Sequence, residues 1–239
     1  MSSKYYYVVF GAILGACFWI YFGISAGSVA TDQMRRVVAN PHVYDAKQDI
    51  AVIKLKTFYF VPKNKRPEPN WEQALERALK ELANFHQSQF AGTSIIRYEV
   101  AATSTAGLYD NLTYDTQDTS HGNPAALLSI RDELLRRELV KSDPAQSDGY
   151  NAILIIYEGV GAAGTPGFAL LSRKFLTDKQ YEAIVSSLLA HEFYHTLGMR
   201  DDYDIEGGRP HGFDIMGMAR TMPLPYAFIK PEVLKRMGI

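Results

Sequence analysis

Residues 190–201 read AHEFYHTLGMRD, and two histidines stand four positions apart within them. On a helix, this spacing places the imidazoles of His191 and His195 one turn apart on the same face. Two neutral imidazoles arranged in this way bind one Zn²⁺ near tetrahedral angles. Glu192 lies beside them, where its carboxylate is placed to take a proton from a zinc-bound water. The stretch therefore predicts a helix that carries a zinc site.

The residues before the first histidine indicate which face of this helix is buried. Apolar side chains recur there at helical spacing, at Tyr181, Ile184, Val185, Leu188 and Leu189. The same spacing continues into the two histidines and the glutamate between them, so the buried face ends in ionisable groups. Burying such groups without a partner is costly, and a metal ion is a partner that offsets the cost. We predict one helix from about Asp178 to Leu197, beginning with a Thr177–Gln180 capping box.

The residues after the second histidine supply a candidate for the third ligand. Gly198 is predicted to end the helix in a left-handed turn that reverses the chain. Asp201 stands ten residues after His191 and offers a hard oxygen donor. Other acidic or imidazole side chains nearby remain alternatives, and they are Asp202, Asp204, Glu206 and His211. The acidic cluster also leaves a Ca²⁺ site open, although a solvated loop is the simpler interpretation.

A second motif, Asp214-Ile215-Met216-Gly217-Met218, follows downstream. Together with the stretch from His191 to Asp201, it resembles metzincin-type zinc peptidases, in which a methionine-containing turn lies beneath the metal. Most members of that clan use a third histidine as the third zinc ligand. The aspartate-ended motif of this chain is instead similar to the zinc motifs of snapalysin and immune inhibitor A peptidases. The resemblance implies that Met216 is the turn methionine, with Met218 as runner-up.

The resemblance also implies a fold, an activity and a set of roles. The fold is α+β, a zincin- or metzincin-like mixed β-sheet with crossover helices and an active-site helix. The activity is zinc-dependent endopeptidase action on a protein or peptide substrate. His191, His195 and Asp201 are then the zinc ligands and Glu192 is the catalytic base. The alternatives are a catalytically inactive metallopeptidase-like binding module anchored to the membrane, and a structural zinc site or chance motif.

Six further elements are expected before the zinc helix: a strand at 50–62, a helix capped by Asn70 with its apolar face running to Phe85, a strand at 95–101, a helix from Pro124 to Val140, a strand at 152–157 and an extended segment at 168–172. The uninterrupted apolar run of 152–157 is typical of a central strand buried on both faces. The segment from Gly167 to Ser172 stands where metzincins have an antiparallel edge strand that pairs with substrate. An ordinary edge strand fits it equally well.

The first 30 residues have a different composition from the rest of the chain. No charged residue occurs from Tyr5 to Thr31, and Tyr5 to Ile24 is almost continuously apolar, a length that suits a membrane-spanning helix. We predict a transmembrane anchor or signal segment at 1–30, a tether at 31–49 and a zinc metallopeptidase domain at 50–239. The domain is then expected outside the cytoplasm, or secreted if cleavage follows Ala30.

Bulk composition excludes other classes of function. The net charge is −1 and no long run of Lys or Arg occurs in the 239 residues, so no nucleic-acid partner is expected. The single cysteine, Cys17, excludes a disulfide framework and a thiolate metal site. Substrate preference and oligomeric state have no signature in the sequence.

Overall fold

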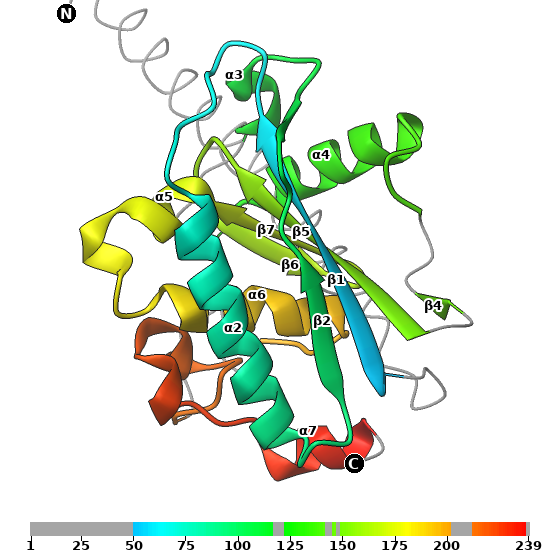
Figure 1. Ribbon diagram of the computed structural model, residues 1–239, viewed down its shortest axis with the longest axis vertical. Coiled ribbons are helices and arrows are strands. Elements are labelled where there is room, and N and C mark those ends of the chain that lie inside the picture. The colour runs from blue at the N-terminus through cyan, green and yellow to red at the C-terminus, as the bar shows by residue number, and fades with distance from the viewer. Residues whose placement is uncertain (1–49, 117–121, 142–144, 147–148, 202–211, 238–239) are drawn as a thin grey trace, which may run out of the picture. The chain divides into compact units, whose positions relative to one another are not determined.

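The computed structural model describes residues 50–116, 122–141, 145–146, 149–201 and 212–237 (Figure 1). The predicted membrane segment at 1–30 and the tether at 31–49 lie outside these residues. Within the described residues, no helix is long and apolar enough to cross a membrane.

A mixed sheet of seven strands forms the centre of the described chain. The strands are β1 (Val52–Val61), β2 (Ile95–Glu99), β3 (Ser104–Ala106), β4 (Ala145–Gln146), β5 (Gly149–Tyr157), β6 (Ala162–Thr165) and β7 (Phe168–Ser172). The main order is β2-β1-β5-β7-β6, in which the first four strands are parallel and β6 runs antiparallel to β7. The short β3 pairs with β1, and β4 pairs with β5.

Helices cover both faces of this sheet. They are α2 (Glu72–Gln89), α3 (Asn111–Tyr114), α4 (Pro124–Arg136), α5 (Arg173–Thr177), α6 (Val185–Thr196) and α7 (Pro231–Arg236), with 3₁₀ turns η1 (Lys179–Tyr181), η2 (Met218–Thr221) and η3 (Leu224–Tyr226). One apolar core joins the sheet to α2 and α6, and a second core joins its other face to α4. Figure 1 shows α2 and α6 on the same side of the sheet.

The central position of β5 confirms the prediction made from its apolar run. Leu154 and Ile156 belong to the core beneath α2 and α6, whereas Ile155 and Tyr157 belong to the core beneath α4. Successive side chains of a strand point to opposite faces, so a strand between two helical layers needs apolar residues at every position. The resulting mixed sheet with helices on both faces agrees with the predicted α+β architecture.

The prediction that Phe168–Ser172 forms the sheet edge is wrong. This strand, β7, lies between β5 and β6, and the edge strand is β6 in the preceding glycine-rich segment. The register pairs Thr165 with Phe168, so only two residues connect the strands, and Gly167 has a φ of 80°. Glycine adopts positive φ without a steric penalty, which permits this tight hairpin.

The predicted helix from Asp178 to Leu197 is also corrected. The chain forms α5 first, where the Ser172 hydroxyl accepts a hydrogen bond from the Lys174 N–H, and then the short η1. Asp178 has an extended backbone with ψ 124°, which interrupts the helix, and α6 begins only at Val185. The capping box at Thr177 is therefore not formed, because the residues that follow it are not α-helical.

Two other helix starts give opposite outcomes. Asn70 was expected to cap α2, but it has a φ of 65°, the N-cap is Trp71, and no side chain caps this end. Pro124 does occupy the first turn of α4, as predicted, and the Asn123 side chain accepts a hydrogen bond from the Ala126 N–H. That helix ends at Arg136, before the predicted end at Val140.

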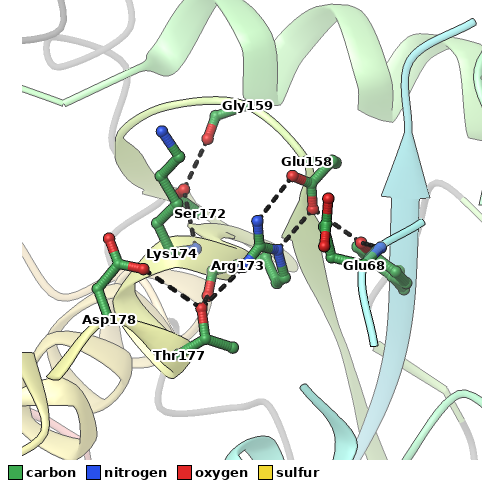
Figure 2. A network of polar contacts seen from close by, with 9 residues as sticks. Glu68, Glu158, Gly159, Ser172, Arg173, Lys174, Thr177 and Asp178 are labelled. Atoms are coloured by element: carbon green, nitrogen blue, oxygen red, sulfur yellow. Dashed lines mark hydrogen bonds and ion pairs between the residues drawn. The ribbon is translucent and has the colours of Figure 1, made fainter. Parts of the chain in front are cut away.

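A network of polar contacts joins the carboxyl ends of β5 and β7 (Figure 2). Arg173 Nε donates to Glu158 Oε2 at 2.7 Å, and Arg173 Nη2 donates to Glu158 Oε1 at 2.9 Å. The Tyr59 hydroxyl of β1 donates to the same Oε2 at 2.7 Å and accepts from the Glu68 N–H at 2.8 Å. The carboxylate of Glu158 therefore joins the ends of β5 and β7 to Tyr59 of β1, whose hydroxyl in turn holds the loop that follows β1.

Candidate metal centre

The helix α6 is buried around most of its circumference in its second half. It packs against α2 on one side and against β6 and β7 on the other. His191 is 3% exposed and Glu192 is 8% exposed, while Phe193 and Tyr194 between the histidines are also buried. The apolar partners of this helix thus hold its ionisable residues in an environment that disfavours isolated charge.

Each histidine of α6 is oriented by a backbone carbonyl. His191 Nδ1 lies 2.9 Å from the carbonyl oxygen of Ile215, and His195 Nδ1 lies 2.8 Å from that of Met199. A carbonyl oxygen only accepts hydrogen bonds, so each Nδ1 carries the proton and donates. In the neutral rings, both Nε2 atoms then carry the lone pair with which a histidine ligates a metal.

Asp201 faces both of these nitrogens. Its Oδ1 lies 3.1 Å from His191 Nε2 and 3.5 Å from His195 Nε2. Two ligands on a tetrahedral zinc, each about 2.0–2.1 Å from the ion, are about 3.3 Å apart. The two distances therefore bracket the separation that a shared zinc ion requires.

The arrangement of these three atoms favours an added positive charge at the site, either a metal ion or a proton. Asp201 Oδ1 is buried and has no hydrogen-bond partner among the described residues. With both Nδ1 atoms protonated, neutral histidines direct two lone pairs at a third acceptor atom, which is unfavourable in a buried site. A metal ion, or a proton on one ring, resolves the conflict. The residues present thus fit a divalent metal with a nitrogen and oxygen ligand set.

The charges of these residues are strongly coupled. Burial raises the pKa of Asp201, but the contacts with His191 and His195 lower it by a larger amount. The net pKa of Asp201 is therefore well below its usual range. Burial lowers the pKa of His195, but the hydrogen-bonding contact and the charge of Asp201 raise it more, to about 9. Without a metal, the Asp201 carboxylate therefore stabilises the protonated form of His195.

Glu192 belongs to the same group. Its carboxylate and the ligand atoms of His191 and His195 all lie within 4.8 Å of one another, an arrangement that can hold a metal ion. Burial raises the pKa of Glu192, the two histidines and Arg220 lower it, and the charge of Asp201 raises it again. The net pKa is above its usual value, which brings this carboxyl group closer to the range of a general acid–base.

A tight turn at 214–217 supplies the carbonyl that contacts His191. The Asp214 side chain accepts from the Met216 N–H at 2.8 Å and from the Lys230 N–H at 2.8 Å, while the Asp214 carbonyl accepts from the Gly217 N–H at 2.9 Å. The Ile215 carbonyl in this turn is the one that orients His191. Met216 is 2% exposed, whereas Met218 is 43% exposed at the start of η2.

A buried histidine elsewhere supports the same helix from its other side. His86 of α2 has Nδ1 3.3 Å from the Tyr194 hydroxyl and Nε2 2.8 Å from the Ser94 hydroxyl. The Ser94 hydroxyl donates to the Ile50 carbonyl, so it accepts from His86 Nε2–H, and Tyr194 donates to Nδ1. Burial lowers the pKa of His86 to about 3, so this histidine is neutral.

The described residues bring four of the predicted site residues together, namely His191, Glu192, His195 and Asp201. The fifth, Met216, lies in the supporting turn. The alternative third ligands Asp202, Asp204, Glu206 and His211 all lie outside the described residues. The orienting carbonyls of Ile215 and Met199 were missed, because a backbone carbonyl has no signature in the sequence. Asp214 had a readable signal, since an aspartate commonly accepts from the N–H two residues later in a turn.

No protein-family model matches the chain, and no curated protein is similar to it in sequence. Solved structures with a partly similar fold include three of OgpA from Akkermansia muciniphila, each with a TM-score of 0.46. One is a catalytically inactive form in complex with an O-glycopeptide substrate, at 16% identity. The other two are the wild type in two crystal forms, at 17% and 18% identity. Each match covers 79% of this chain but 60% of the OgpA chain, and it assigns no activity to this protein.

Proposed function

We propose that this chain is a zinc-dependent endopeptidase in which His191, His195 and Asp201 hold the ion. The observation that carries the proposal is the convergence of three acceptor atoms, with separations of 3.1 and 3.5 Å from the carboxylate oxygen to the two ring nitrogens. Zinc binds two imidazoles and a carboxylate in catalytic sites that leave a fourth position for water or substrate. The resemblance of the zinc motif to metzincins supports the same assignment.

The residues of the chain divide the chemical work. Bound zinc would supply a Lewis acid for the scissile carbonyl and for the attacking water. Glu192 takes the proton of that water and returns it to the leaving amine. The carbonyls of Ile215 and Met199 would hold both rings with Nε2 facing Asp201, as ligands of the ion. The turn containing Met216 would correspond to the methionine turn of metzincins.

The edge strand β6 provides a place for an extended substrate. Ser172 N–H donates to the Gly161 carbonyl, whereas the Ala162 carbonyl accepts from the Asn123 N–H outside the sheet. Backbone groups of an edge strand alternate between the partner strand and the open side. By this alternation, the N–H and C=O of Gly164 point away from β7. A peptide that adds to the sheet there would lie beside α6, which packs against β6.

One experiment tests the proposal directly. The full-length protein is purified, its zinc content is measured, and cleavage of an unfolded protein such as casein is followed. The matched control is Glu192→Gln, which is nearly isosteric but cannot take a proton from the water. We expect about one zinc per chain in both proteins and hydrolysis in the wild type alone. Zinc without hydrolysis in the wild type would support the inactive binding module, and a wild type without zinc would exclude both.

We also propose that residues 1–30 anchor the protein to a membrane by a single span, with the domain at 50–239 outside the cytoplasm. The support is the apolar stretch from Tyr5 to Ile24. Alkaline extraction of cell membranes tests this proposal. Full-length protein in the soluble fraction would overturn the anchor, and a shortened soluble form would indicate cleavage after Ala30.

A further inference from the structure

Gly164 occupies the point at which the edge strand β6 touches α6. A Cβ atom added to Gly164 would overlap His195 Cβ, and it would lie 2.7 Å from the Glu192 carbonyl oxygen and 2.9 Å from His195 Cδ2. Two of these three neighbours are a backbone atom and a Cβ, which cannot rotate away. Any side chain at this position therefore forces the strand and the helix apart.

The backbone conformation at this position does not itself require glycine. Gly164 is absent from the residues with positive φ, unlike Gly161 and Gly167 at the two ends of the same strand. Those two glycines fit their local backbone conformations. The need for glycine at position 164 therefore comes from its contact with α6.

The atoms in contact belong to the proposed metal site. His195 Cδ2 is bonded to Nε2, the ring nitrogen that faces Asp201 at 3.5 Å. The same ring is held on its other side by the Met199 carbonyl, 2.8 Å from Nδ1. The imidazole of His195 therefore lies between a fixed hydrogen bond and the backbone of β6. A Cβ at Gly164 would therefore press on this ring and tilt it, besides separating the strand from the helix.

We propose that Gly164 is a positioning residue that sets the orientation of His195, so that the substrate-binding edge and the metal ligand are in direct contact. The proposal rests on the zinc endopeptidase function. It explains why the strand that offers backbone groups to a peptide has no side chain toward α6 at this residue. A peptide paired with Gly164 would consequently lie at a fixed distance from the His195 ring.

The test is the metal affinity of Gly164→Ala in the full-length protein. Zinc affinity is measured by competition with a chromophoric chelator, and the absorption spectrum of bound Co²⁺ reports the ligand geometry. We expect zinc affinity to fall about 10- to 100-fold, the range seen when a residue that orients a ligand is changed. The Co²⁺ spectrum should change as well, because the His195 ring is tilted.

The matched control is Gly107→Ala. A Cβ at Gly107 would also be crowded, at 2.8 Å from Phe60 and 2.9 Å from the Tyr114 hydroxyl, but these atoms are the ends of side chains in the core beneath α4. Urea unfolding of both metal-free variants measures how much each change destabilises the fold. Equal losses of zinc affinity in the two variants would indicate general destabilisation and would overturn the proposal.

A second pair of variants covers the case in which Gly164→Ala does not fold. Ala162 and Ala163 are both 9% exposed, but Ala162 belongs to the core shared with α6 and Ala163 to the core beneath α4. We expect Ala162→Gly to weaken zinc binding several-fold and Ala163→Gly to leave it unchanged. Wild-type affinity in a folded Gly164→Ala variant, or in Ala162→Gly where Gly164→Ala does not fold, would overturn the positioning role. A wild type that binds no zinc would instead overturn the proposed function.

Discussion

Two charged clusters, one at the ends of sheet strands and one on and after α6, solve the problem of burial in opposite ways. In the first, Glu158 receives two hydrogen bonds from Arg173 and a third from the Tyr59 hydroxyl, so its carboxylate is neutralised within the chain. Burial raises the pKa of Glu158, but these hydrogen bonds lower it more, and the net pKa lies below its usual value. In the second cluster, the carboxylate of Asp201 faces two imidazole nitrogens.

The difference lies in the donors. The first cluster contains a permanent cation with several N–H groups, and it needs nothing from solution. The second cluster has its ring protons committed to the Ile215 and Met199 carbonyls, so the centre lacks a donor unless a ring is protonated. A cluster that balances its own charge stabilises a fold, whereas a cluster with converging acceptors is suited to binding a cation.

Removing a ligand from the second cluster should give the largest effect. We expect His191→Ala or His195→Ala to reduce zinc affinity by more than about 100-fold, because losing a ligand exceeds the effect of losing a residue that only orients one. Asp201→Ala should also weaken binding strongly, and Asp201→His should preserve it. A chelator competition assay measures each affinity.

The control for the carboxylate is Asp202→Ala, which should bind zinc nearly as well as the wild type. Greater sensitivity at Asp202, Glu206 or His211 than at Asp201 would reassign the third ligand and leave the two histidines in place.

Breaking the first cluster should change stability without changing zinc binding. Glu158→Gln leaves the Arg173 guanidinium, whose side chain is 13% exposed, without its counter-charge. We expect a loss of about 3 kcal/mol in the free energy of unfolding, measured with urea. Changing both residues to glutamine should recover part of this loss, since no charge is then left unpaired. A Glu158→Gln variant that loses zinc with unchanged stability would contradict the comparison.

The titration of His86 and His195 should distinguish a histidine buried in the core from one in the second cluster. In the metal-free protein, burial lowers the pKa of His86 to about 3. Burial also lowers the pKa of His195, but Asp201 raises it by a larger amount, to about 9. NMR titration should therefore show His195 protonated at neutral pH and His86 neutral. Saturating zinc should remove the His195 step and leave His86 unchanged. Persistence of the His195 step would exclude this residue as a ligand.

These shifts also predict opposite effects of pH on stability. The unfolded state binds a proton at His86 below its ordinary pKa of about 6.5 while the folded state does not, so folding stability falls as pH drops from 6.5 towards 3, by about 1.4 kcal/mol per unit at most. For metal-free His195, the folded state keeps its proton longer. Its contribution is complete below about pH 6.5 and is lost as pH rises through 9.

The sequence by itself determined the features that depend on local periodicity. The four-residue spacing of His191 and His195, the apolar run of β5 and the amphipathic face of α2 were all readable, because helices and strands repeat every 3.6 and 2 residues. The membrane segment at 1–30 is likewise a local pattern, and it stays a prediction.

Only the tertiary structure decided the features that depend on distant partners. Which strand forms the edge followed from a hairpin register, and the interruption at Asp178 followed from the extended backbone before α6. The carbonyl of Ile215 reaches His191 across 24 positions, and Gly164 meets His195 across the sheet–helix interface. Such contacts leave no periodic signal in the sequence. A backbone carbonyl is the same in every residue, and the need for a glycine is visible only once the neighbouring atoms are known.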